Sequence, residues 1–469
     1  MSSLSVGATD PMRIPASTIG RPQRAGWLLA SLFALLVGIY ALWLMALWPG
    51  ILGEDSAAIM LEVDRAGEFR SGKPAFWFFF INTFYGSTGL AEVPIAIQLA
   101  IAALVFARIL AWCWQQRHIR TFWFLLLFIA LSPRAIYSAS TLYPDGPFAI
   151  ASVSLLFELW LTLRTRRLST ASFGMIAVTL PFALFARANG IVLLIPLVYA
   201  VIRLKGRQRL RLGVLALAWC ALMIVGASAH KSSGHGVLFP LAAFETVNFM
   251  QPRPMQLWTP KPRISAPTLE ALHRYASTED LLKNYDRDYW DPLYHKPDGP
   301  RLGRMSRQDK RTVVREFFRY NLWQNIPAFA ASRVNLFLVS ALAQGEEPSM
   351  TYAQHVIPRT SSQSTYRAMD VPGLTGFVEG LHHASFPYRW LLGTPLLGIA
   401  LLLWLFFTAA RRRQWDEFML ALPMIAQLGG IFLLSIAGEY RYLLPFFMLP
   451  LVILPILLAR AHASAGSAQ

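Results

Sequence analysis

Long apolar runs recur along the chain, and short basic segments separate many of them. A helix that crosses the apolar core of a bilayer needs about 20 mainly apolar residues. Ten runs approach this length, and we expect membrane-spanning helices at about 25–48, 93–114, 121–140, 144–163, 170–186, 190–202, 212–229, 391–410, 418–437 and 443–459. The pattern therefore predicts an all-α polytopic membrane protein with about ten transmembrane helices.

Arginine and lysine gather at alternate ends of these runs. Arginine clusters lie at 164–167 and 411–413, directly after the predicted fourth and eighth crossings. Because Lys and Arg are enriched in cytoplasmic loops, the clusters orient the chain. Ten crossings with this orientation place both termini in the cytoplasm, and the alternate loops lie on the outer side of the membrane.

Two outer segments are longer than simple turns. The loop 49–92 includes the aromatic run 76–81, which is too short to span and is predicted to lie as a helix on the membrane surface. Region 230–388 is far longer than ordinary loops and is predicted to fold as a helical periplasmic cap. The expected domains are membrane helices one to seven in 1–229, the cap, and helices eight to ten in 389–469.

Composition supports a membrane protein and excludes other classes. Only 15% of the residues are charged, whereas soluble domains carry about 25%. The formal net charge of +17 is concentrated in the short connections, so we expect no nucleic-acid partner. Both cysteines, Cys113 and Cys220, lie inside apolar runs, which argues against a structural disulfide. We expect no metal site and no cofactor.

The first group of candidate functional residues follows the first apolar run. Pro49 and Gly50 end the helix, and Glu54 and Asp55 come next, at the predicted outer surface. A carboxylate there can accept a proton from a hydroxyl group. The alternative is that Asp55 or the adjacent serine only caps the next helix. Lys73, in the same outer loop, is a further candidate cation.

Two further groups occupy outer ends of the third to sixth runs. Asp145 lies in a Tyr-Pro-Asp-Gly-Pro sequence, which is also typical of a simple turn. Arg187 and Asn189 lie in a hairpin that is too short to reach far beyond the membrane. An arginine at that depth favours an anionic partner, which is either a ligand or a nearby acid of the protein.

The last group precedes the final crossing and consists of Glu439, Tyr440, Arg441 and Tyr442. The planar guanidinium of Arg441 suits a phosphate, and the flanking tyrosines suit a sugar ring or a lipid chain. A contact between Glu439 and Arg441 that serves only the structure is the alternative. All these polar groups lie at the predicted outer ends of helices.

Together the groups resemble the membrane glycosyltransferases of the GT-C superfamily, which take sugars from polyprenyl-phosphate carriers. The resemblance rests on the acidic pair Glu54-Asp55 in the first outer loop, the Asp145 loop, the 187–190 turn and the sequence 439–442. It implies a multi-pass protein of the bacterial inner membrane with a periplasmic active site. Many members have more transmembrane helices and a C-terminal soluble domain, and this chain departs from them in both respects.

The resemblance also implies roles for individual residues. Asp55 would be the catalytic base, with Glu54 as a second catalytic contact. Donor phosphate would be bound by Arg441, Arg187 and Lys73. Substrate would contact Asp145, Glu439, Tyr440, Tyr442 and Asn189. The expected partners are a polyprenyl-phosphate sugar donor, a glycan, lipid or protein acceptor, and membrane lipids.

Two other classes of function remain open at this level. A transporter or flippase of lipid-linked sugars is expected to have internal repeats and polar groups near the membrane midplane. Here no repeat is obvious and the charges gather on one side. A scaffold protein without an active site is the third possibility, and the clustered acids and arginines argue against it.

Overall fold

The structure is a computed structural model that describes residues 22–65, 68–230, 238–252, 263–344, 351–369, 371 and 373–466. Over these residues the chain is helical and contains no named strand. Extended pairing is limited to two isolated bridges, Ile51 with Thr141 and Tyr289 with Ala437. The predicted all-α class is confirmed.

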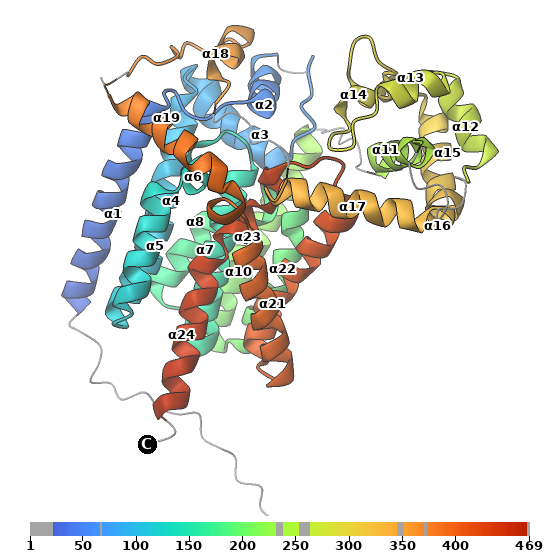
Figure 1. Ribbon diagram of the computed structural model, residues 1–469. Helices are drawn as coiled ribbons and strands as arrows, with labels where there is room; N and C mark the ends of the chain where they lie inside the picture. The colour runs from blue at the N-terminus through green and yellow to red at the C-terminus, as the bar shows by residue number, and fades with distance from the viewer. Residues whose placement is uncertain are drawn as a thin grey trace, which may run out of the picture.

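The first half of the chain forms a bundle of roughly parallel helices (Figure 1). Its elements are α1 (Pro22–Ala46), α2 (Glu54–Asp64), α3 (Ala75–Ile81), η2 (Asn82–Gly86), α4 (Glu92–Gln115), α5 (Ile119–Leu131), α6 (Pro133–Ser140), α7 (Asp145–Thr165), α8 (Thr170–Phe185), η3 (Ala188–Leu193), α9 (Leu194–Arg203) and α10 (Gly206–His230). Helix α7 is buried along nearly its whole length. Its buried Glu158 pairs with Arg108 of α4 at 2.9 Å, which offsets the cost of a charge in the interior.

The last part of the chain completes the bundle with α21 (Leu396–Arg411), α22 (Trp415–Leu434), η8 (Tyr440–Leu443), α23 (Leu444–Met448) and α24 (Pro450–Gly466). Helices α23 and α24 pack against α7, at the centre of the bundle. Because the first and last segments share one core, residues far apart in the sequence meet at the ends of the helices.

The helices identify a multi-pass membrane protein by their length and apolar composition. Within the described ranges, seven pass this test, at Gly26–Ala46, Glu92–Gln115, Asp145–Thr165, Gly206–His230, Leu374–Arg411, Trp415–Leu434 and Tyr440–Ala461. The pair α5 and α6 gives an eighth if it is one span bent by 64°. The bend lies at Pro133, because a proline ring cannot continue the hydrogen bonding of the preceding turn. The two other predicted crossings, 170–186 and 190–202, coincide with the shorter apolar helices α8 and η3–α9.

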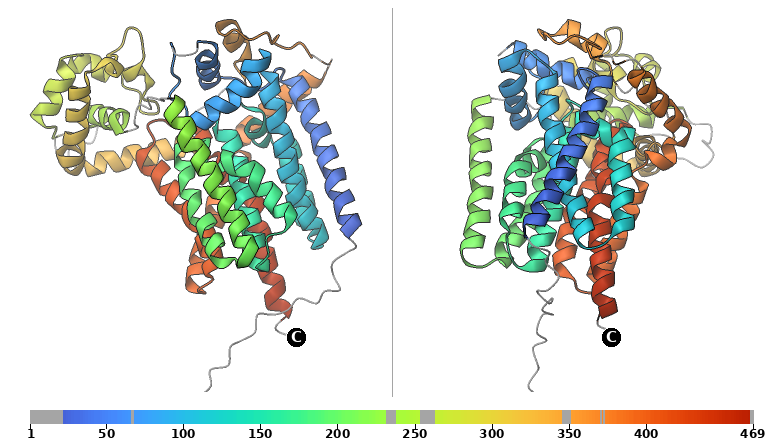
Figure 2. Two further views of the ribbon diagram at one scale, coloured as in Figure 1. Left: turned by 180° about the vertical axis from the view of Figure 1, so that it is seen from behind. Right: turned by 90° about the vertical axis from the view of Figure 1, so that its left-hand side faces the viewer.

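The region 230–388 contains two parts. The first is a separate group of short helices with its own core, which lies to one side of the bundle in both Figures 1 and 2. We call this group, residues 238–336, the side cap. Its elements, together with the end of the last helix, are α11 (Leu238–Met250), α12 (Ala266–His273), α13 (Thr278–Lys283), α14 (Asp291–Tyr294), η4 (Leu302–Arg304), α15 (Arg307–Glu316), η5 (Phe317–Asn321), α16 (Leu322–Gln324) and α17 (Ile326–Ser340).

The second part returns to the main bundle and continues past residue 388 to Leu392. It consists of α18 (Ala353–Val356), η6 (Ile357–Arg359), α19 (Leu374–Ser385), η7 (Phe386–Tyr388) and α20 (Arg389–Leu392). Leu342, Val356 and Val378 join the core of the bundle rather than that of the side cap. Helices α2, α3, α18 and α19 lie together at one end of the bundle (Figure 1), and the candidate site lies at this end.

Candidate functional site

The segment between α1 and α2 is tied to the start of α7. The Ile51 N–H donates to the Ser140 carbonyl at 3.0 Å, and the Leu142 N–H donates to the Ile51 carbonyl at 3.2 Å. Gly53 lies so close to the Tyr143 hydroxyl that a Cβ atom at position 53 would overlap it. A side chain at position 53 would therefore displace the Tyr143 hydroxyl. This close approach brings the first turn of α2 to the start of α7.

Asp55 lies in the first turn of α2 and faces two cations. Its carboxylate pairs with Lys73 Nζ at 2.5 Å and with the Arg441 guanidinium. Ser56, and not Asp55, takes part in capping α2, because the Ser56 hydroxyl accepts the Gly53 N–H at 3.2 Å. Asp55 is thus free of a capping role, and its charge is directed at Lys73 and Arg441.

Arg441 lies in η8 and links several parts of the site. Besides Asp55, it pairs with Glu439. Its guanidinium lies 4.8 Å from the ring centre of Tyr143 and 5.6 Å from that of Tyr442. Tyr143 was not among the predicted site residues, although it stands two positions before Asp145. The two rings hold the cation in place without using up its hydrogen-bond donors.

Arg187, between α8 and η3, forms the adjoining part of the site. It pairs with Asp145, the first residue of α7. It also donates to Asn189 Oδ1 at 3.3 Å and lies 5.3 Å from the ring centre of Tyr442. Arg187 therefore has an acid of the protein as its partner, which was one of the two predicted alternatives. The Tyr442 ring lies against both Arg187 and Arg441.

The ion pairs make the site balanced in formal charge. Three cations meet three carboxylates, namely Lys73, Arg187 and Arg441 with Asp55, Asp145 and Glu439. They come from the starts of α2 and α7, the loop before α3, the end of α8 and the segment before α23. An anion that enters must compete with these carboxylates for the cations. The N–H donors of the cations are already held in place for it.

Two opposing effects set the proton affinity of Asp55. Burial favours the neutral acid and raises the pKa of Asp55, whereas the positive charges of Arg441 and Lys73 lower it. The two cations outweigh burial, so the pKa of Asp55 lies well below its ordinary value. Burial lowers the pKa of Lys73, and the nearby Asp55 carboxylate opposes that shift. At neutral pH Asp55 is a carboxylate whose proton affinity is suppressed by its partners.

Two predicted site residues point elsewhere. Glu54 pairs with Arg359 at 2.7 Å, and the Glu54 side chain is 75% exposed. Tyr440 is buried against the Arg134 guanidinium, 5.2 Å from its ring centre, and against the ring of Tyr137. Glu54 and Tyr440 thus border the cluster without contributing to its ion pairs.

A hydrogen-bonded turn positions Lys73. The buried carboxylate of Glu62 accepts the Ser71 N–H at 2.9 Å and also the Ser71 hydroxyl, whose oxygen accepts the Lys73 N–H at 3.2 Å. Glu62 is held in turn by His230 at 3.0 Å. Sequence reasoning missed Glu62, although an acid among the apolar residues of α2 is a signal for a polar partner.

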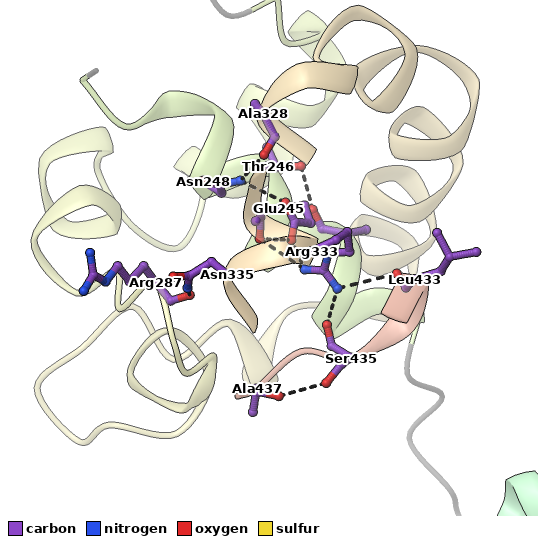
Figure 3. Close-up of polar contacts among 12 residues, drawn as sticks. Glu245, Thr246, Asn248, Arg287, Ala328, Arg333, Asn335, Leu433, Ser435 and Ala437 are labelled. Carbon is purple, nitrogen blue, oxygen red and sulfur yellow. Dashed lines mark hydrogen bonds and ion pairs between the residues drawn. The ribbon is translucent and has the colours of Figure 1, made fainter. Parts of the chain in front are cut away.

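The side cap holds the segment before Arg441 from the other direction (Figure 3). Arg333 of α17 pairs with Glu245 of α11, and both side chains are almost fully buried. The Arg333 guanidinium also donates to the carbonyl of Ser435, just beyond α22. The Gly438 N–H donates to the Asp288 carbonyl at 2.8 Å. Segment 435–438 is therefore fixed to the side cap directly before Glu439.

An apolar groove lies beside Arg134. It has a volume of about 300 Å³ and lies between α5, the start of α6 and the segment 381–393. Two arginines, Arg134 and Arg389, line it among leucine and phenylalanine side chains. Because Arg134 also contacts Tyr440, the groove adjoins the residue directly before Arg441.

Among the residues that the structure describes, no group of three or more His, Cys, Asp or Glu side chains is arranged to hold a metal ion. No protein-family model, no curated protein and no solved structure matches this chain.

Proposed function

We propose that the chain is an inverting glycosyltransferase of the GT-C type. It moves a sugar from a polyprenyl-phosphate carrier to a glycan, lipid or protein acceptor. One observation carries the proposal: Asp55, Lys73, Arg187 and Arg441 converge from distant parts of the chain at one end of an apolar helical bundle. A carboxylate beside clustered cations suits the transfer of a group that leaves as a phosphate.

The proposed setting is the bacterial inner membrane. The chain crosses it ten times, with α8 and η3–α9 as short crossings, and both termini lie in the cytoplasm. The candidate site and the side cap then face the periplasm, and the arginines at 411–413 lie in the cytoplasm, as the preference of basic residues for that side requires.

In the proposed reaction Asp55 takes the proton of an acceptor hydroxyl or amine. The acceptor atom forms a bond to the anomeric carbon, and the bond from that carbon to the phosphate oxygen breaks. The electron pair leaves with the polyprenyl phosphate. Attack from the side opposite the phosphate inverts the anomeric centre. Arg441, Arg187 and Lys73 stabilise the charge that develops on the leaving phosphate.

The ion pairs of Asp55 give donor binding a second effect. A donor phosphate competes with Asp55 for Arg441 and Lys73, and each contact that it takes removes a positive charge from the carboxylate. The pKa of Asp55 then rises from its suppressed value, which makes Asp55 a better base when the donor is present. The apolar groove beside Tyr440 suits part of the lipid chain of the carrier or of a lipid acceptor.

The test is release of polyprenyl phosphate by the purified protein in nanodiscs, with a panel of polyprenyl-phosphate sugars and an envelope extract as acceptor. We expect release by the wild type and none by Asp55→Asn or Arg441→Ala. Glu54→Gln is the matched control, because the adjacent carboxylate lies outside the ion-pair cluster, and it should retain release.

Donor binding separates the two roles. Asp55→Asn removes a competitor of the phosphate, so it should bind donor at least as tightly as the wild type while transferring nothing. Arg441→Ala should lose donor affinity. Normal transfer by a folded Asp55→Asn protein would refute the assignment of the base. Silence of the wild type across the panel, with translocation of lipid-linked sugar in vesicles, would instead identify a flippase.

A further inference from the structure

A second cavity lies at the end of the bundle opposite the candidate site. It has a volume of about 560 Å³. The ends of α7, α9 and α24 surround it, together with the connection between α21 and α22, all far from α2 and α3 (Figure 1). It shares no lining residue with the candidate site. Its lining comprises Trp160, Leu163, Arg164, Arg203, Arg412, Arg413, Gln414, Trp415, Asp416, Glu417, Ile456, Ala459 and Arg460.

The lining carries an excess of positive charge. Five arginines face two carboxylates, and both carboxylates are already engaged. Asp416 accepts the Tyr199 hydroxyl at 2.7 Å and pairs with Arg166 at 2.7 Å, while Glu417 pairs with Arg460. The ion pairs within the described part of the chain include none with Arg164, Arg412 or Arg413. Three cations therefore remain for an external anion.

One of these arginines, Arg413, lies in the turn that ends α21. Helix α21 ends in a turn in which the Gln414 N–H donates to the Ala409 carbonyl at 2.9 Å. Arg413 completes this turn with a φ of 54°, a left-handed conformation that glycine usually provides at helix ends. Arg117 and Arg166 take the same conformation after α4 and α7, so the φ of Arg413 reflects the end of a helix.

Apolar surface lies beside the cations. The Arg164 guanidinium is 5.5 Å from the ring centre of Trp160, and the Trp415 ring is largely exposed. Ile456 and Ala459 of α24 continue this apolar wall. Tryptophan beside basic residues at the end of membrane helices is typical of the zone in which lipid head groups lie. The combination suits a phosphate that is joined to an apolar chain.

We propose that this cavity binds the phosphate of an anionic phospholipid from the adjacent leaflet. Arg412, Arg413 and Arg164 provide the charge. The exposed Trp415 contacts the glycerol and the first part of the chains, and the buried Trp160 supports Arg164. Basic pockets between transmembrane helices commonly bind such head groups. The proposal does not depend on the glycosyltransferase assignment, since the two sites lie at opposite ends of the bundle.

The alternative is a general excess of arginine at the cytoplasmic end, with no preference for any one position. The chain offers a matched control for this alternative. Arg207 and Arg209 are exposed at the start of α10 and lie outside the cavity. They belong to the same end of the bundle, because α10 begins directly after α9, whose last residue, Arg203, lines the cavity.

The experiment is native mass spectrometry of the detergent-purified protein with equal amounts of phosphatidylglycerol and phosphatidylcholine. We expect the wild type to retain phosphatidylglycerol selectively. The double variant Arg412→Gln, Arg413→Gly should lower that affinity roughly thirtyfold, at about a fivefold loss for each arginine. The variant Arg207→Gln, Arg209→Gln should retain wild-type binding. Thermal unfolding checks the fold, and glycine at 413 relieves the backbone there.

A competition arm with soluble glycerol phosphate distinguishes the source of the phosphate. Displacement of phosphatidylglycerol only at high millimolar concentrations supports the lipid. Displacement at micromolar concentrations assigns the cavity to a soluble phosphate ester and overturns the lipid proposal. Equal loss of binding in the two double variants, or equal retention of the two lipids by the wild type, would mean that the cavity has no specific site.

Discussion

The buried ion pair between Glu245 and Arg333 provides a sharp test of how the side cap supports the candidate site. The perturbation is Arg333→Met, which keeps much of the side-chain volume and removes the charge. Glu245 is 0% exposed and then retains only neutral donors, the Ser332 hydroxyl at 2.7 Å and the Asn248 amide at 2.9 Å. Removal of one partner of a buried pair typically costs about 3–5 kcal/mol.

The cost should appear as local opening of segment 435–442. Arg333 donates to the carbonyl of Ser435, and the Gly438 N–H is bonded to Asp288 of the side cap. Hydrogen exchange of a peptide that covers 435–442 measures this opening. A loss of 3–5 kcal/mol predicts exchange faster by roughly 150-fold to 5,000-fold at the protected amides. Peptides from the interior of α7 should exchange at the wild-type rate.

Two further variants complete the measurement. Arg315→Met removes an exposed cation of the side cap, paired with Glu316 at 3.2 Å, and should cost less than about 1 kcal/mol. The double variant Glu245→Gln, Arg333→Met leaves neither member of this pair charged and should recover most of the lost protection. Unchanged exchange at 435–442 in Arg333→Met, or a double variant as labile as the single one, would refute the reasoning.

Three other predictions concern the candidate site. Lys73→Arg should extend activity to more alkaline pH in a pH–rate profile, because the pKa of Lys73 lies below its ordinary 10.5 and arginine stays protonated. An unchanged alkaline limb of the profile would show that Lys73 does not bind the donor. Glu54→Ala should cost less than about 1 kcal/mol of stability in thermal unfolding, since its pair with Arg359 is exposed. A larger loss would contradict this weak role. Gly53→Ala should abolish sugar transfer in the release assay, because the added Cβ overlaps the Tyr143 hydroxyl. Addition of Tyr143→Phe to that variant should restore part of the transfer. Full activity of Gly53→Ala would show that α2 can move away from Tyr143.

The sequence could predict that the polar groups gather at one end of the bundle. The alternation of apolar runs and basic connections puts the starts of α2 and α7 at the same end as the segment before α23. Asp55 and Arg441 therefore meet across 386 positions of sequence. The bend at Pro133 was equally predictable, because it follows from the covalent structure of proline.

The resemblance named Asp55 as the base, but it also placed Glu54 and Tyr440 in the site, and neither joins the ion-pair cluster. In a helix successive side chains diverge by about 100°, so Glu54 and Asp55 cannot both face Arg441. In the 3-10 turn of η8 the step is about 120°, so Tyr440 turns toward Arg134 while Arg441 turns toward Asp55. This geometry depends on where each helix begins, and apolar patterns locate helix ends only to within a few residues.

The two ends of the bundle differ in charge in a way that bears on both proposals. At the candidate site each cation already has a carboxylate partner, so the cluster is stable without a ligand, and a phosphate binds only by exchange. An enzyme that must release its product phosphate gains from such exchange, because the returning carboxylates compete with the product. At the opposite end Arg412 and Arg413 lie outside every ion pair among the described residues. In the proposed lipid site no carboxylate competes with the ligand for Arg412 and Arg413, so the ligand stays bound. Lasting binding suits a resident lipid, whereas a transferred substrate must leave.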